Sequence, residues 1–359
     1  MPLDVVVLGA GLMGRLLALS LKRQGARVQV HDAHGPDANH SAARAAAAML
    51  APLAESAITE LPVVSMGLHG LKRWPELLET LPVPVYFQQD GTLILWHRQD
   101  QNEAKRFEGM LRRTHAQMPE LPEPQALNSE QLANFEPATV GRFSQGLYLP
   151  KEGQLDNRQL LDALHLALQQ AGINVYWHSP VAAHDADSLR AKFPCADKIV
   201  DCRGLGARIA WQELRGVRGE VVRVHAPDVK LQRPTRLIHP RYPIYIAPKQ
   251  NDLFVIGATE IESDDLSPAS VRSTLELLSA AYSVDSGFAE GRILEITTQA
   301  RPALRDNLPA LRPLGNDVLQ VNGLYRHGFM IAPAMLDSSI QWLATGDSPL
   351  ARRWNLLPK

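Results

Sequence analysis

The sequence predicts an α/β fold in which a Rossmann-like domain is interleaved with an α+β domain built on an antiparallel sheet. The chain starts with an apolar run, a glycine-rich turn and a helical pattern. Alternating helices and apolar strands return after Asn157 and again near the C-terminus, with β-rich segments between them. Its 359 residues are enough for two cores, because a single core stops growing near roughly 250 to 300 residues.

The N-terminal segment predicts a βαβ unit. Leu3–Leu8 is an apolar strand, and the run Gly9–Gly14 forms a GxGxxG turn into a helix over Leu12–Gln24. A second strand, Arg27–Val30, leads to Asp32. Glycines alone mark ordinary turns, but with a strand before, a helix after and an acid beyond, they form the dinucleotide-binding pattern.

Each residue of this pattern has an expected role. Gly9 allows a tight turn, Gly11 lets the backbone approach a pyrophosphate, and Gly14 lets the helix pack on the strand. The pyrophosphate would lie at the helix N-terminus. Asp32 would bind a ribose hydroxyl, and because an acid repels a 2′-phosphate, it favours FAD or NAD over NADP.

Composition excludes several classes of partner. The 37 basic and 38 acidic residues leave a formal net charge of −1, which favours neither nucleic acid nor an anionic membrane surface. We expect Cys195 and Cys202 to be buried thiols in a reducing compartment. No basic leader and no membrane-length apolar run occur, so we expect a cytoplasmic protein without an integral membrane segment. His31, His34 and His40 lack a second ligand cluster, so we expect no metal site.

The alanine-rich segment Ala42–Ala51 has two interpretations. Alanine has the highest helix propensity, which favours a helix. Small side chains also let a backbone lie close to something flat or crowded. The sequence does not choose between them.

β-rich segments predict the second domain. Val85–Phe87 and Thr92–Trp96 flank Asp90-Gly91, which is a strong hairpin signal. Charged surface helices are expected over Arg98–Arg113 and Ser129–Phe135.

The remaining elements divide the chain. The cofactor-binding domain takes residues 1–82, 143–214 and 296–359, and the substrate-binding domain takes residues 83–142 and 215–295. The other predicted helices are Asn157–Ala171, Pro268–Tyr282 and one from Ala332, and the other predicted strands are Ile173–Trp177, Lys198–Cys202, Glu220–His225, Tyr242–Ala247, Leu253–Gly257, Arg292–Thr297 and Val318–Val321.

The glycine-flanked loop Gly323–Gly328 near the C-terminus is a candidate cofactor contact. Pro333 suits the first turn of a helix, whose N-terminus would then point at this loop and stabilise a reduced, anionic flavin. The alternative is a βα connection with Arg326 and His327 on the surface.

Three side chains are candidates for substrate binding. Arg301, at a strand end where the domains meet, could clamp a carboxylate, or it could pair with Asp306 or a backbone carbonyl. Tyr245 lies on an alternating strand, where its hydroxyl could reach a carboxylate or its ring could simply pack on the sheet. Glu260 is either a pocket acid or an exposed charge, and we expect it to be exposed.

Together these segments resemble the D-amino acid oxidase superfamily of FAD-dependent oxidoreductases, and most closely its glycine oxidase branch of thiamine biosynthesis. The resemblance covers nearly the whole chain. It rests on the order and spacing of the motifs Val6–Gly14, Ala45–Leu50, Pro180-Val181, Val217–Glu220, Tyr245–Pro248, Val255–Glu260, Arg301-Pro302 and Arg326–Ala334.

The resemblance implies non-covalent FAD and the residues that hold it. Related sarcosine oxidases attach flavin through a C-terminal cysteine, whereas both cysteines here lie well before that part. The implied cofactor-binding residues are Gly9, Gly11, Leu12, Met13, Gly14, Asp32, Ala33, Ala47, Ala48, Met49, Val181, Gly204, Leu324, Tyr325, Arg326, His327, Gly328, Phe329 and Met330.

The resemblance also implies the reaction. Arg301 would pin the substrate carboxylate, Tyr245 would assist, and Arg326 would line the pocket beside the flavin. The partners would be a small amino acid, glycine above all, and O2, giving an imine for the thiazole branch of thiamine biosynthesis and H2O2. Positioning of the neutral amine would do most of the catalytic work, without a side-chain base. A homo-oligomer is left open.

Two departures and three alternatives remain. Ala42-Ala43 stands where glycine oxidases carry hydroxyls, so phosphate contacts must come from the backbone or Ser41. Glu260 stands where some relatives are apolar, and in the pocket it would favour a substrate with a second cation. The alternatives are a D-amino acid dehydrogenase that uses a quinone, a flavin-binding partner protein without turnover, and an NAD-dependent dehydrogenase.

Overall fold

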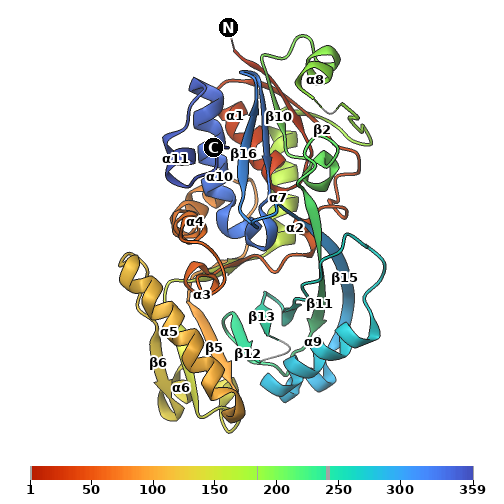
Figure 1. Ribbon diagram of the computed structural model, residues 1–359. Helices are drawn as coiled ribbons and strands as arrows, with labels where there is room; N and C mark the ends of the chain where they lie inside the picture. Colours follow the sequence, from red (N-terminus) through yellow and green to blue (C-terminus); the bar gives the residue numbers. More distant parts are fainter. Residues whose placement is uncertain (1, 184, 240–242, 359) are drawn as a thin grey trace.

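The computed structural model describes residues 2–183, 185–239 and 243–358. Its strands form a six-stranded sheet, an eight-stranded sheet and a small three-stranded sheet. In Figure 1 the six-stranded sheet lies in the upper half with α1, α10 and α11, and the eight-stranded sheet lies in the lower half with α5 and α9. The predicted α/β fold class is confirmed.

The six-stranded sheet has the order β16-β17-β10-β1-β2-β9. The predicted βαβ unit is present as β1 (Asp4–Leu8), α1 (Leu12–Arg23) and β2 (Arg27–His31). β1 pairs in parallel with β2 and with β10, and β10 pairs in parallel with β17. The carboxyl ends of these strands therefore meet at one edge. The other members are β9 (Asn174–Tyr176), β10 (Lys198–Asp201), β16 (Ala310–Leu314) and β17 (Val318–Asn322).

Two glycines of the turn have the predicted conformational roles. Gly9 has φ +90°, and a Cβ on it would lie 2.8 Å from the carbonyl oxygen of Cys202. A Cβ on Gly14 would lie 1.8 Å from the carbonyl oxygen of Gly9. No side chain fits at either position, so α1 packs directly on the turn.

The eight-stranded sheet has the order β15-β11-β14-β13-β12-β5-β7-β6. Its longest pair is antiparallel, β11 (Arg215–His225) with β15 (Arg292–Ala303), and α9 (Val271–Val284) packs against β11. The predicted strand Tyr242–Ala247 corresponds to β13 (Ile244–Pro248), and Tyr242 lies outside the described residues. The other strands are β5 (Thr92–Trp96), β6 (Gln125–Asn128), β7 (Gln145–Leu149), β12 (Thr235–Ile238) and β14 (Leu253–Gly257).

The predicted hairpin around Asp90-Gly91 is wrong. β4 (Phe87–Gln88) pairs with β8 (Gly153–Leu155) in the three-stranded sheet, together with β3 (Met49–Leu50). Both edges of β5 are occupied, by β7 and by β12. Gly91 instead donates its N–H to the carbonyl oxygen of Glu152 at 2.9 Å, so the turn leads the chain from one sheet to another.

The alanine-rich segment satisfies neither interpretation over its whole length. α2 covers only Ala42–Ala45, and β3 follows at Met49–Leu50. Ala48 between them has φ +54°, a left-handed backbone conformation that interrupts a helix.

Helix α10 (Gly328–Thr345) begins before the expected Ala332, so Pro333 lies inside the helix and not in its first turn. Proline has no N–H to donate to the carbonyl of Phe329 four residues earlier. The buried indole of Trp74, on α4 (Leu61–Glu79), donates to that oxygen at 2.8 Å. A Cβ on Gly70, one turn before Trp74, would lie 2.1 Å from the carbonyl oxygen of Met330, so α4 and α10 pack in close contact.

The other helices cover the sheets. They are α3 (Pro52–Glu55), α5 (Gln101–Gln117), α6 (Ser129–Phe135), α7 (Asn157–Gln170), α8 (Ala186–Lys192) and α11 (Pro349–Arg353). One large apolar cluster joins α1, α4, α7 and α10 to the six-stranded sheet, and another lies between α9 and the eight-stranded sheet. In the described ranges, no helix has the length and apolar character needed to cross a membrane. The limits of the two domains stay predictions.

Both cysteines are free thiols, but the expectation that both are buried is wrong. Cys195 is exposed, because it lies in the connection between α8 and β10 at the molecular surface.

Candidate active site

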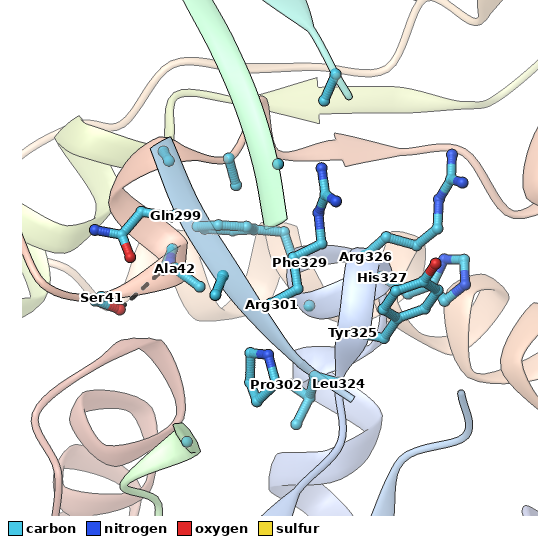
Figure 2. Close-up of a pocket in the computed structure, with 18 of the residues that line it drawn as sticks. Ser41, Ala42, Gln299, Arg301, Pro302, Leu324, Tyr325, Arg326, His327 and Phe329 are labelled. Carbon is cyan, nitrogen blue, oxygen red and sulfur yellow. Dashed lines mark hydrogen bonds between the residues drawn. The ribbon is translucent and has the colours of Figure 1, made fainter. Parts of the chain in front are cut away.

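A cavity of about 1380 Å³ lies between the carboxyl ends of the parallel strands and the eight-stranded sheet. It brings together Arg301, Tyr245, Arg326 and the implied cofactor-binding residues except Gly14, which packs behind the turn. Figure 2 shows Ser41, Ala42 and Gln299 on one side of the pocket and Tyr325, Arg326 and His327 on the other. The lining predicted as cofactor contacts consists of Gly9, Gly11, Leu12, Met13, Asp32, Ala33, Ala47, Ala48, Met49, Val181, Gly204, Leu324, Tyr325, Arg326, His327, Gly328, Phe329 and Met330.

The end of the cavity at the glycine-rich turn fits a dinucleotide. Gly11 is the N-cap of α1 and has no side-chain cap, so N–H groups of the first turn are available to an anion. A Cβ on Gly11 would lie 3.1 Å from Ser41 Oγ and would narrow this cradle. Asp32 accepts hydrogen bonds from the N–H of Ala10 at 2.6 Å and of His34 at 2.8 Å, which hold its carboxylate beside the turn. These residues suit the pyrophosphate and a ribose of FAD.

Arg15 is a buried cation beneath this end that sequence reasoning missed. Its guanidinium donates to the carbonyl oxygens of Ala10, Pro36 and Leu161, each at 2.7 Å. Burial lowers the pKa of Arg15 to about 10. One side chain thereby joins the glycine-rich turn, the loop that follows Asp32, and α7.

Lys249 was also missed. It is buried, and its Nζ donates to the carbonyl oxygens of Ala47 at 2.9 Å and Leu155 at 2.8 Å and to Gln154 Oε1 at 2.8 Å. Burial lowers the pKa of Lys249 to about 7. This side chain fixes Ala47, which lines the cavity.

Arg301 lies on β15 at the other end of the cavity. Its guanidinium donates to the carbonyl oxygen of Thr259 at 3.2 Å and more weakly to that of Arg218 at 3.5 Å. A Cβ on Gly219 would lie 2.2 Å from Arg301 Nη2, so the missing side chain gives the guanidinium its space. Burial lowers the pKa of Arg301. Within the part of the chain that the structure describes, no carboxylate, including that of Asp306, lies within ion-pair distance of it.

Tyr245 lies on β13 with its hydroxyl over Gly257, where a Cβ would come within 2.7 Å of the phenol oxygen. Burial raises the pKa of Tyr245, and the positive charge of Arg301 opposes that shift. The phenol therefore keeps its proton and can donate a hydrogen bond next to Arg301.

Arg326 lies between two carboxylates. Its Nη1 donates to Glu260 Oε2 at 2.8 Å, and its Nε lies 3.2 Å from Glu55 Oε2. Tyr325 donates its phenol to Glu260 Oε1 at 2.5 Å. The side chain of Glu260 is 47% exposed, as expected, and it also lines the cavity, where it is bonded to Tyr325 and Arg326.

Glu55 is a third buried charge that the sequence did not reveal. It is buried at the end of α3 and contacts Arg236 and Arg326 as well as His327, whose Nδ1 lies 3.3 Å from Glu55 Oε2. Burial acts to raise its pKa, but Arg326 and Arg236 hold the pKa of Glu55 well below its usual value. The short segment Pro52–Glu55 carries no periodic pattern that would indicate this role.

A second buried glutamate supports α3. Glu152 Oε1 accepts a hydrogen bond from the N–H of Ala54 at 2.8 Å. Burial raises the pKa of Glu152 to about 7. The residues described hold no group of three or more His, Cys, Asp or Glu side chains placed to bind a metal ion.

Comparisons with known proteins identify the family of this chain. The DAO family model, FAD dependent oxidoreductase, matches residues 4–335. The chain is 38% identical over 349 residues to a protein of Rhizobium etli assigned as the thiamine biosynthesis oxidoreductase ThiO, covering 97% of this chain and 99% of that protein.

Solved structures share the fold. The crystal structure of glycine oxidase from Geobacillus kaustophilus superposes with a TM-score of 0.80 at 23% identity, covering 96% of this chain and 95% of that one. Iminodiacetate oxidase from Chelativorans gives a TM-score of 0.78 at 20% identity, covering 98% and 99%. The chain belongs to the DAO family of FAD-dependent oxidoreductases, and FAD is its cofactor.

Proposed function

We propose that this protein is an amino acid oxidase that converts glycine, or another small amine with one carboxylate, to its imine and reduces O2 to H2O2. The similarity to glycine oxidase and ThiO supports the reaction class. The observation that carries the proposal is Arg301, a cation that faces the cavity without a carboxylate partner among the described residues.

A substrate carboxylate would complete this site. A guanidinium removed from water is costly unless an anion accepts its hydrogen bonds, and the carbonyl oxygen of Thr259 supplies only partial negative charge. A carboxylate can accept two parallel hydrogen bonds from the arginine fork. Tyr245 would donate to the same carboxylate, because its raised pKa keeps the phenol protonated.

Bound FAD supplies the two-electron acceptor, and the chain positions the substrate for it. Arg301 and Tyr245 would hold the carboxylate, which fixes where the neighbouring Cα lies. The substrate amine must lose its ammonium proton before Cα can be oxidised, and no side-chain base at Cα is required. Because the positive charge of Arg326 neutralises the carboxylate of Glu260, the substrate needs no second cationic group to pair with Glu260.

The attachment of FAD and the product's use are part of the proposal. Cys202 lies beside the glycine-rich turn, and burial raises the pKa of its thiol well above the usual value, which supports non-covalent FAD.

The 38% identity with the Rhizobium etli protein supports a role in the thiazole branch of thiamine biosynthesis. The exposed thiol of Cys195 supports a reducing compartment such as the cytoplasm.

An anaerobic absorption spectrum tests the reaction. Glycine, sarcosine, D-alanine and D-proline are added in turn, and we expect the flavin bands to bleach with at least one of them and to return when air is admitted. Return only after a quinone is added would indicate a dehydrogenase, and bands that no amine bleaches would refute the oxidase.

The variant Arg301→Gln tests the clamp. Removal of a charged, two-bond contact worth about 3 kcal/mol should lower kcat/KM at least about 100-fold while FAD stays bound. Arg292→Gln removes an exposed arginine at the other end of β15 and serves as the control, with unchanged kinetics. Unchanged kcat/KM in Arg301→Gln would show that the carboxylate is bound elsewhere.

A further inference from the structure

We propose that Glu260 determines the charge class of the substrate: by occupying Arg326, it restricts the pocket to molecules with a single carboxylate. This inference rests on the proposed function, because it concerns the same pocket. It assigns Glu260 and Arg326 to specificity and leaves the carboxylate clamp to Arg301.

The geometry uses both oxygens of the Glu260 carboxylate. Oε1 accepts from the phenol of Tyr325 at 2.5 Å, and Oε2 accepts from Arg326 Nη1 at 2.8 Å. On its other side the Arg326 guanidinium meets Glu55 at 3.2 Å. Arg326 is therefore bound on two sides by carboxylates, which neutralise its positive charge toward a ligand anion.

The side chains at this end of the cavity carry an excess of one positive charge, which one negative charge on a ligand would neutralise. Among the described residues, three arginines, Arg236, Arg301 and Arg326, face two glutamates, Glu55 and Glu260. One positive charge remains, and it lies on Arg301, whose acceptors among the described residues are carbonyl oxygens. An amino acid with its amine neutral supplies one negative charge and balances the site. A second carboxylate would lie uncompensated beside two glutamates.

Of the two glutamates, Glu260 is the one that can be substituted while the ion pairs of Glu55 are kept. Glu55 is buried and contacts Arg236, Arg326 and His327, so its removal would leave buried cations unpaired. Glu260 is half-exposed, and Arg326 would keep Glu55 as a partner after Glu260 is neutralised. Substitution of Glu260 should therefore free Arg326 Nη1 for a second ligand carboxylate.

The test compares two ligands that cannot be oxidised as amines. Methoxyacetate has one carboxylate, and diglycolate has two on the same ether frame. Dissociation constants are measured on the FAD-loaded protein from the change in flavin absorbance. We expect methoxyacetate to bind at least about tenfold more tightly to the wild type, because the second carboxylate meets like charges.

Glu260→Gln should reduce this preference by about tenfold or more, mainly through tighter diglycolate binding. Glu262→Gln removes a nearby exposed glutamate that pairs with Arg215 outside the cavity, and it should keep the wild-type preference. A wild-type protein that binds both ligands equally would overturn the proposal without any variant. So would an unchanged preference in Glu260→Gln, or an equal change in Glu262→Gln.

The same titration separates this proposal from the proposed function. Selective binding of methoxyacetate without oxidation of any amine would refute the oxidase and leave the role of Glu260 intact. Oxidation of glycine without selectivity between the two ligands would refute the role of Glu260 alone. Binding of neither ligand would refute both Arg301 as the carboxylate clamp and the specificity built on it.

Discussion

Trp74→Phe tests the hydrogen bond that compensates for the proline inside α10. Trp74 is buried, and its indole N–H donates to the carbonyl of Phe329, the acceptor that Pro333 leaves without a helical donor. Leaving a buried carbonyl unsatisfied costs about 1–3 kcal/mol. The smaller ring adds a packing loss of about 1–2 kcal/mol. We expect Trp74→Phe to lower the free energy of unfolding by about 2–5 kcal/mol.

A double-mutant cycle isolates the hydrogen bond from the packing. Pro333→Ala restores a backbone N–H four residues after Phe329, so the carbonyl gains a donor within the helix. In that background Trp74→Phe should cost only the packing loss, and the coupling between the two substitutions should be about 1–3 kcal/mol. Trp354→Phe is the control, because its indole donates to Ser65 Oγ and not to a helix carbonyl.

Urea denaturation provides the measurement. All variants are unfolded at one fixed excess of FAD, because a cofactor that binds only the folded state adds to apparent stability. Free energies are compared where the denaturant slopes agree. The reasoning is refuted if Trp74→Phe costs the same with proline and with alanine at position 333, or if the Trp354→Phe control couples to Pro333→Ala as strongly.

Two further predictions concern buried charges. Between pH 5 and 7 the native Glu152 carboxyl, with a pKa of about 7, keeps a proton that the unfolded chain releases near 4.5, so stability should fall by up to about 3 kcal/mol as pH rises. In Glu152→Gln, which keeps an acceptor for Ala54, thermal unfolding at pH 5, 6 and 7 should show a flatter dependence, and an unchanged slope would contradict the assignment. Arg15→Met should weaken FAD binding at least about tenfold in titrations of the apoprotein, because the glycine-rich turn loses its link to Pro36 and Leu161, while the exposed Arg23→Met on the same helix should not. Equal affinities in the two arginine variants would show that the turn holds its shape without Arg15.

Short sequence motifs correctly predicted those backbone turns that depend only on residues close together in the chain. The GxGxxG turn was found because Gly9 and Gly14 meet backbone atoms at positions where no Cβ fits. The hairpin was predicted wrongly from an equally local signal, since Asp90-Gly91 turns the chain but does not decide which strand edges are free. Partner choice in a sheet depends on the whole fold, which a dipeptide cannot encode.

The missed residues have partners that are far away in the chain. Glu55 pairs with Arg236, separated by 181 positions, and Lys249 donates to Ala47, separated by 202 positions. From the sequence alone, a single glutamate or lysine is expected on the surface, because the segments that bury it lie elsewhere in the chain. Arg301 was singled out from its place at a strand end, but the absence of a carboxylate partner among the described residues emerged only from the structure.

The order of the six-stranded sheet sets when the cofactor site can form during synthesis. β1 leaves the ribosome first, but its neighbour β10 begins at Lys198, and the next strand, β17, ends at Asn322. Parallel strands far apart in the chain pair slowly, because the conformational entropy of the long loop between them is lost before the strand contacts form. The loop Gly323–Gly328 emerges only after all six strands of this sheet. A nascent chain therefore carries the glycine-rich turn without its neighbouring strands until the whole sheet has been made, and FAD can stabilise only a chain that already contains this loop.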